Sequence, residues 1–254
     1  MFIREIKNAV RAAANSIFPR VCIGCGEIID NGEYFCDLCY SDIVRTDLDN
    51  RCEKCGLVKG KCDCENNFFH FEGCISPLVN EGSARMAMYR AKFSRKQRNL
   101  SYFSKQLALA VRSRYGDIKF DGICYVPMPR AKRMRRGYNQ CAVMAYELSK
   151  ILGVKMLRNA LICRKNGGSQ HMLSPKRRFD NVRGLYGFKC GNDGKTVLLI
   201  DDIKTTGATL DECSRQLLFS GADRVFCATA LITDLTDKDN ERKERIHNGN
   251  RNRN

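Results

Sequence analysis

Short apolar runs alternate with segments of helical periodicity through most of the chain. The apolar runs predict strands at 122–126, 157–163, 196–200 and 225–232. Segments with apolar residues on one face predict helices at 85–115, 138–152 and 210–219. This alternation favours a mostly parallel sheet flanked by helices on both faces. We therefore expect an α/β domain over residues 71–235, with ligands bound beyond the carboxyl ends of its strands.

The first residues have a different pattern, that of one amphipathic helix at 1–19. Its apolar residues near one face are Ile3, Ile6, Val10 and Ile17. Pro19 would end this helix, and charged residues such as Arg4 and Lys7 argue against a secretory signal. We expect a helix that docks on the rest of the chain. The alternative is a helix that lies on a membrane surface.

Composition adds a strongly basic character. The 254 residues carry a formal net charge of +16, which favours anionic partners such as phosphates, nucleotides or nucleic acid. Part of the excess lies at 236–254, where apolar residues are almost absent and a disordered basic tail is predicted. No apolar run reaches the roughly 18 residues that a transmembrane helix needs.

The chain has 15 cysteines, and the first eight have the spacing of metal ligands. An odd number without a signal peptide argues against a disulfide framework and for a reducing cytoplasm. The predicted ligands are Cys22, Cys25, Cys36, Cys39, Cys52, Cys55, Cys62 and Cys64. C-x-x-C-G turns of this kind supply thiolates to tetrahedral zinc, so we expect a double zinc ribbon at 20–70 with about two structural sites. Interleaved pairing and an iron–sulfur centre are the alternatives.

The other seven cysteines lack such spacing. They are Cys74, Cys124, Cys141, Cys163, Cys190, Cys213 and Cys227. Because they are scattered over predicted strands, helices and loops, we expect them to be small buried apolar residues.

The stretch VLLIDDIKTTGAT at Val197–Thr209 carries the clearest chemistry. An apolar strand leads into Asp201 and Asp202, and a short loop then opens the next helix. The loop residues are Lys204, Thr205, Thr206, Gly207, Ala208 and Thr209. Amides at a helix start and threonine hydroxyls can hold a phosphate, while two carboxylates can accept hydrogen bonds from vicinal hydroxyls. A phosphorylated sugar fits both. The alternative is an acid pair that caps a helix or holds a lone magnesium ion.

Two further segments are rich in cations. After the predicted strand at 122–126 come Arg130, Lys132, Arg133, Arg135 and Arg136, which suit a multiply charged anion such as pyrophosphate. The segment 163–184 is a basic, glycine-containing connection that is too long for an ordinary loop, and it predicts a lid. A solvated charge run and a mobile surface loop are the respective alternatives.

VLLIDDIKTTGAT resembles the phosphoribosyl-diphosphate motif of type I phosphoribosyltransferases. With VPMPRAKRMRRGYNQ, the block that starts at Arg164 and the cysteine-rich head, the chain from Cys22 to Ile232 resembles the competence protein ComF family. One departure is Ser169, where the family more often has Thr.

The resemblance implies a type I phosphoribosyltransferase-like fold behind a zinc module. It implies that Asp201 and Asp202 hold the ribose hydroxyls, that 204–209 holds the 5-phosphate, and that magnesium accompanies phosphoribosyl diphosphate. Pyrophosphate would be held by Arg130, Lys132, Arg133 and Arg136. The flexible loop would supply Arg164, Lys165, Gln170, Arg177, Arg178 and Asn181. The reaction implied is phosphoribosyl transfer to an acceptor.

The rival hypothesis is a binding protein without catalysis. The family resemblance implies a role in DNA uptake, with single-stranded DNA and a DNA-translocating helicase as partners. The +16 charge and the zinc ribbons favour a nucleic-acid role. Against it, we expect no dense groove of aromatic and basic residues, and the sequence has no Trp.

Overall fold

The computed structural model describes residues 19–29, 34–62, 64, 68–93, 98–164, 182–189 and 191–234. The predicted helix at 1–19 (apart from Pro19), the predicted tail at 236–254 and most of the predicted lid lie outside these residues. The described helices are α2 Asp37–Ser41, α3 Gly82–Phe93, α4 Arg98–Tyr115, α5 Arg130–Arg136, α6 Gln140–Leu152 and α8 Ala208–Phe219. The strands are β1 Gly73–Ile75, β2 Leu78–Val79, β3 Gly122–Tyr125, β4 Leu161–Cys163, β5 Tyr186–Phe188, β6 Thr196–Lys204 and β7 Arg224–Ile232.

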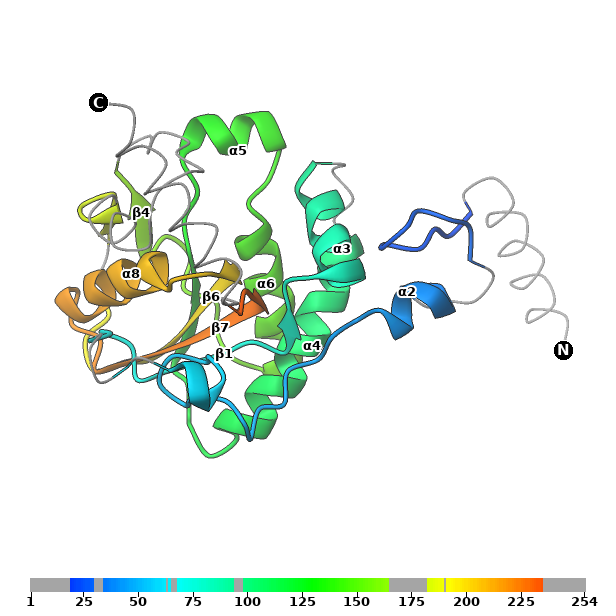
Figure 1. The fold of residues 1–254 in the computed structure, drawn as a ribbon. Helices are drawn as coiled ribbons and strands as arrows, with labels where there is room; N and C mark the ends of the chain where they lie inside the picture. Colours follow the sequence, from blue (N-terminus) through cyan, green and yellow to red (C-terminus); the bar gives the residue numbers. More distant parts are fainter. Residues whose placement is uncertain are drawn as a thin grey trace, which may run out of the picture.

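A parallel five-stranded sheet forms the centre of the fold (Figure 1). Its order is β1-β7-β6-β3, with β2 also paired to β7, and every pairing is parallel. The register sets Leu198 of β6 between Ile123 of β3 and Phe226 of β7. The predicted mostly parallel sheet with flanking helices is confirmed.

Three predicted elements differ from the structure. The segment 157–163 is not a strand of the main sheet, because β4 begins only at Leu161 and pairs antiparallel with β5. The predicted helix 85–115 is two helices, α3 and α4. The strand expected to end at Ile200 continues to Lys204, because β7 offers pairing partners as far as Ile232. The two acids therefore lie inside the strand rather than after it.

Two apolar layers cover the sheet. Side chains alternate along a strand, so Leu198 and Ile200 of β6 point into the layer of α3, α4 and α6, while Val197 and Leu199 point into the layer of α8. The cysteine-rich head joins both layers. Cys22, Ile23 and Phe35 pack in the first, whereas Cys55, Phe69 and Phe71 pack in the second. The first ribbon therefore packs against the helices α3 and α4, whereas the second packs in the layer that contains α8.

Polar contacts attach the second ribbon to the sheet domain. Arg51 is buried and donates from Nη1 and Nη2 to the two carboxylate oxygens of Asp234, at 2.6 and 2.7 Å. The backbone N–H and the ring Nδ1 of His70 contact Oδ1 of Asp211 on α8, at 2.7 and 2.9 Å. Within the residues described, no helix has both the length and the apolar character needed to cross a membrane.

Candidate functional site

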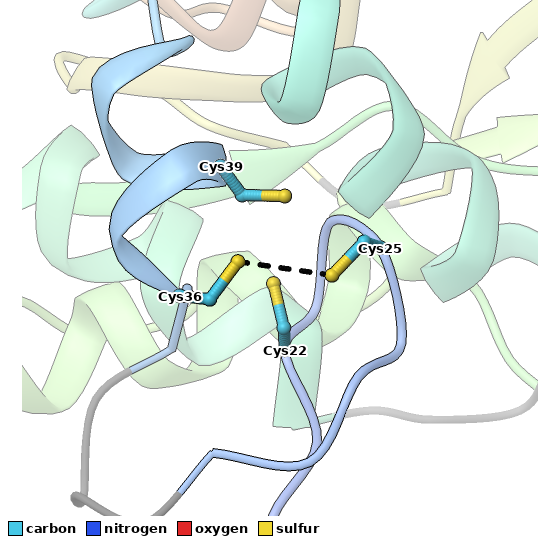
Figure 2. Close-up of side chains that lie close together, drawn as sticks. All are labelled: Cys22, Cys25, Cys36 and Cys39. Carbon is cyan, nitrogen blue, oxygen red and sulfur yellow. Dashed lines mark hydrogen bonds between the residues drawn. The ribbon is translucent and has the colours of Figure 1, made fainter.

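Four thiols converge in the first cysteine cluster (Figure 2). The sulfurs of Cys22, Cys25, Cys36 and Cys39 lie within 4.8 Å of one another, and those of Cys25 and Cys36 are 3.8 Å apart. Tetrahedral zinc with Zn–S bonds of about 2.3 Å separates its sulfurs by about 3.8 Å. A turn carries the first two ligands, with the Gly26 N–H bonded to the Cys22 carbonyl, and α2 carries Cys39. Gly26 has φ +92°, a conformation that side chains disfavour.

The second cluster repeats this geometry. Its sulfurs belong to Cys52, Cys55, Cys62 and Cys64, and they too lie within 4.8 Å of one another. The Cys52–Cys64 and Cys55–Cys62 sulfur pairs are 3.8 and 3.7 Å apart. Pairing is therefore sequential, with each cluster built from consecutive cysteines, and the interleaved alternative is wrong. The eight predicted ligands all fall in these two clusters, and both fit zinc.

Backbone amides favour the thiolate form at one ligand of each cluster. Burial alone would raise the pKa of Cys22, but N–H groups of Cys25, Cys36 and Gly24 lower it to about 6. Burial likewise opposes ionisation of Cys52, yet the N–H groups of Cys55 and Lys54 and the Cys62 thiol help to lower its pKa to about 7. Thiolates are the form that binds zinc.

We expect about two zinc ions per chain, because eight thiolates form two closed tetrahedral sites. Cys25→Ser and Cys55→Ser should each reduce the content to about one ion. Elemental analysis of the purified protein measures this, with Cys163→Ser as a control outside both clusters. A content near zero, or iron with visible absorbance, would contradict the assignment.

The two acids of β6 form a buried polar site. Asp201 and Asp202 are each 8% exposed. Oδ1 of Asp201 accepts from the Cys141 thiol at 3.3 Å and from the Asp202 N–H at 2.8 Å. Oδ2 of Asp202 accepts from Nε2 of Gln140 at 2.5 Å and contacts the Lys92 ammonium at 2.7 Å. Side chains from α3 and α6 thus meet the acid pair.

These contacts give the two carboxyl groups different pKa values. Burial and the neighbouring charge of Asp202 raise the pKa of Asp201 to about 7. Burial would also raise the pKa of Asp202, but the Lys92 charge, with hydrogen bonds from Lys92 and Gln140, holds it below its usual value. Asp202 is the ionised partner, and Asp201 titrates near neutrality.

The Gly-Tyr-Asn-Gln segment at 137–140 positions α6 against the acids. Gly137 ends α5 in a left-handed conformation, and the Tyr138 hydroxyl donates to the Ala91 carbonyl of α3. Asn139 caps α6 by accepting from the Cys141 N–H and donates to the Val126 carbonyl. Gln140 then bonds Asp202 with its amide nitrogen and accepts from Arg136 Nη1 at 2.6 Å with its oxygen. The motif explains the approach of Gln140 and Cys141.

The loop after β6 leads directly into α8. Gly207 stands at the start of this helix with φ +85°, and its carbonyl accepts from the Asp211 N–H at 2.8 Å. Lys204 is buried rather than free at the surface. A Cβ added at Gly207 would lie 3.3 Å from both Lys204 Cε and the Phe69 ring. The loop at 204–209 therefore packs on the segment that follows the second ribbon.

The predicted pyrophosphate cations lie on the short helix α5, rather than in a loop. Arg130, Lys132 and Arg133 are exposed, and Arg136 is half-buried. Of the predicted lid residues, only Arg164 is described, and its N–H donates to the Leu185 carbonyl. The other five, Lys165, Gln170, Arg177, Arg178 and Asn181, lie outside the described residues.

A groove of about 1590 Å³ lies between α3, α5 and the first ribbon. The rings of Tyr89 and Phe93 are 4.5 Å apart and 56% and 58% exposed, and the Arg136 guanidinium lies 5.5 Å from the Phe93 ring. The cationic residues that line this groove are Arg85, Arg90, Lys92, Lys132, Arg135 and Arg136. The expectation of no groove of aromatic and basic residues is wrong, because α3 and α5 bring together residues that are about 40 positions apart in the sequence.

Sequence reasoning also missed Lys92, Gln140 and Cys141 at the acid pair. Gln140 is the last residue of the VPMPRAKRMRRGYNQ motif, but the sequence analysis assigned it no role. Lys92 belongs to no motif. A lysine in the last turn of an amphipathic helix gives no signal of its buried partner.

Comparisons with known proteins identify a family match in the cysteine-rich head and relatives over larger parts of the chain. The double zinc ribbon domain family matches residues 13–67. The chain is 28% identical over 225 residues to the DNA utilization protein YhgH of Escherichia coli, covering 82% of this chain and 94% of that protein. It is 32% identical over 128 residues to Competence protein F of Haemophilus influenzae, covering 48% and 56% of the two chains.

Two solved structures show a weaker likeness. Purine phosphoribosyltransferase from Pyrococcus horikoshii matches 52% of this chain and 84% of its own, at 17% identity and a TM-score of 0.34. Glutamine phosphoribosylpyrophosphate amidotransferase from B. subtilis matches 51% of this chain at 20% identity and a TM-score of 0.36, but this covers only 25% of the enzyme. The chain is therefore a homologue of DNA utilization protein YhgH and of Competence protein F, with a double zinc ribbon near its N-terminus.

Proposed function

We propose that the chain binds phosphoribosyl diphosphate with magnesium at the carboxyl end of β6. The observation that carries the proposal is the continuity of two buried carboxylates, Asp201 and Asp202, with a glycine-initiated loop that opens α8. Carboxylate oxygens suit the vicinal hydroxyls of ribose, and the amides at the start of α8 suit its 5-phosphate. The exposed cations of α5, beginning at Arg130, suit the diphosphate.

This arrangement supports transfer chemistry at the anomeric carbon. The bond between that carbon and the diphosphate oxygen breaks, pyrophosphate leaves, and a nucleophile bonds to the carbon. Positive charge develops on the sugar ring, and the nearby carboxylates of β6 favour it. Bound magnesium would supply charge neutralisation on the diphosphate. The eight cysteines of the two clusters form no disulfide, which suits a reducing compartment, so we place the protein in the cytoplasm.

Calorimetric titration of the purified protein with phosphoribosyl diphosphate tests the proposal. We expect saturable binding that requires magnesium, with a dissociation constant below the millimolar range. Ribose 5-phosphate with magnesium is the matched ligand control, since it lacks the diphosphate. Absence of magnesium-dependent binding at millimolar ligand would contradict the assignment.

A second candidate function is favoured by the groove between α3 and α5. Two exposed aromatic rings beside six cations form the kind of surface on which single-stranded nucleic acid stacks its bases and neutralises its phosphates. The homologues are named for DNA utilization and competence. We propose that this groove binds single-stranded DNA.

We expect Tyr89→Ala to weaken binding of a single-stranded oligonucleotide by roughly 5- to 150-fold, because one stacked base contributes about 1–3 kcal/mol. Arg135→Ala should instead flatten the salt dependence, by about 0.7 in the slope for each phosphate that is no longer neutralised. Fluorescence anisotropy over a series of salt concentrations measures both. Lys155→Ala removes an exposed cation that does not line the groove and should change neither by a comparable amount. Binding that is tight and insensitive to salt would count against this function.

A further inference from the structure

Lys92 connects the groove to the acid pair. It lies in the last turn of α3 and lines the groove, yet its ammonium contacts Oδ2 of Asp202 at 2.7 Å. The side chains of the pair are 18% and 11% exposed. The same carboxylate oxygen accepts from Gln140, at 2.5 Å. One oxygen of Asp202 is therefore held by a lysine and an amide together.

The position of the ammonium matters because three acidic side chains are buried together in the surrounding site. Carboxylate oxygens of Asp201 and Asp202 and the sulfur of Cys141 lie within 4.8 Å of one another, and all three residues are buried. Arg136 reaches Asp202 only through Gln140, whose oxygen it contacts at 2.6 Å. Lys92 is thus in direct ion-pair contact with Asp202. Without a cation, burying that carboxylate would be costly.

The ligand of the proposed function needs the oxygen that Lys92 holds. A ribose hydroxyl or a magnesium ion that reached Oδ2 of Asp202 would meet the ammonium at hydrogen-bond distance. Lysine side chains rotate readily, and α3 places this one beside open groove volume. A route for the ammonium away from Asp202 therefore exists on the groove side.

We propose that Lys92 is a tethered cation that a divalent metal ion or the magnesium-bound sugar phosphate displaces from Asp202. This inference rests on the proposed function. Lys92 is then a positioning residue: it holds Asp202 in the ligand-free protein and is exchanged on binding. Competition of this kind lowers ligand affinity while it keeps the empty site stable.

The test uses magnesium alone on the full chain. We expect Lys92→Met to lower the melting temperature in metal-free buffer and millimolar magnesium to restore it. The wild type, in which Lys92 competes for Asp202, should need more magnesium for a smaller rise. Lys92→Arg keeps the charge and should behave like the wild type. Lys132→Met removes another groove cation that is not in contact with Asp202, and it should gain no response to magnesium. A Lys92→Met protein whose stability ignores magnesium would overturn the proposal.

Titration with magnesium phosphoribosyl diphosphate forms the second arm. Because Lys92 competes for Asp202, Lys92→Met should bind this ligand about fivefold more tightly than the wild type. Weaker binding by the variant would show that Lys92 holds the ligand instead, and would overturn the exchange. If no protein binds the ligand but Lys92→Met still gains its magnesium response, the proposed function fails and the exchange of cations stands.

A measurement on the wild-type protein tests the displacement of Lys92 without relying on a variant that must fold. Acetylation of Lys92, followed by mass spectrometry of its peptide, reports whether the ammonium is engaged with Asp202. Magnesium phosphoribosyl diphosphate should speed acetylation of Lys92 severalfold and leave that of Lys155 unchanged. Slower or unchanged acetylation of Lys92 at saturating ligand contradicts displacement.

Discussion

Asp201→Asn is expected to weaken magnesium-dependent binding of phosphoribosyl diphosphate by about tenfold to a hundredfold. A hydrogen bond to a charged group is worth about 1.5–3 kcal/mol, and asparagine cannot supply the second anionic oxygen. The residue titrates near neutrality in the free protein, so asparagine resembles its protonated form. Calorimetric titration at pH 8, where the wild-type carboxyl is mostly ionised, measures the loss.

Folding should not suffer from the same substitution. Asparagine keeps an oxygen that can accept from the Asp202 N–H and the Cys141 thiol. Asparagine also carries no charge, so it avoids the cost of an ionised carboxylate at a position where burial raises the pKa of Asp201. Above pH 7 the variant should therefore be at least as stable to urea as the wild type. Asp223→Asn, at an exposed carboxyl, is the matched control and should alter neither property. Asp201→Asn that binds like the wild type would exclude this carboxylate from the site.

Cys55→Ser is expected to abolish ligand binding together with one zinc ion, whereas Cys25→Ser should lose zinc and keep binding. Cys55 is buried in the apolar layer that contains Val197 and Leu199 of β6. Phe69 belongs to the same layer and would lie 3.3 Å from a Cβ added at Gly207, so this layer extends to the candidate phosphate loop. Loss of this metal should reduce the free energy of unfolding by more than about 3 kcal/mol.

The first cluster provides the comparison. Cys25 is exposed, and its carbonyl accepts from Arg90 of α3 at 2.5 Å, on the groove side of the molecule. Zinc analysis, urea unfolding and ligand titration on both variants decide the matter. Equal effects of the two substitutions on ligand binding would contradict a specific link between the second ribbon and the loop at 204–209.

The sequence predicted the parts of the site that are contiguous in the chain. Each zinc cluster uses consecutive cysteines, and the acids, Gly207 and the start of α8 follow one another in one stretch, so spacing alone indicated them. The partners of the acids come from α3 and α6, whose approach depends on tertiary packing. Only Gln140 stood in a motif, and Lys92 did not.

Strand ends were harder to predict for a related reason. The apolar run ends at Ile200, but β6 continues to Lys204 because hydrogen bonding to β7 does not depend on side-chain polarity. Conversely, Leu157 is apolar without belonging to a strand, since its side chain packs on the α8 layer. Hydrophobic pattern reports burial more directly than it reports backbone pairing.

The packing of the two ribbons in two different apolar layers limits how this architecture can be divided or recombined. A truncation that begins at residue 71 would retain every strand of the sheet but strip Cys22, Ile23 and Phe35 from one layer and Cys55 and Phe69 from the other. Both newly bared surfaces would be apolar and prone to aggregation. The cysteine-rich head consequently cannot be exchanged freely between homologues. A head taken from a homologue would have to fit two separate apolar surfaces of the sheet domain.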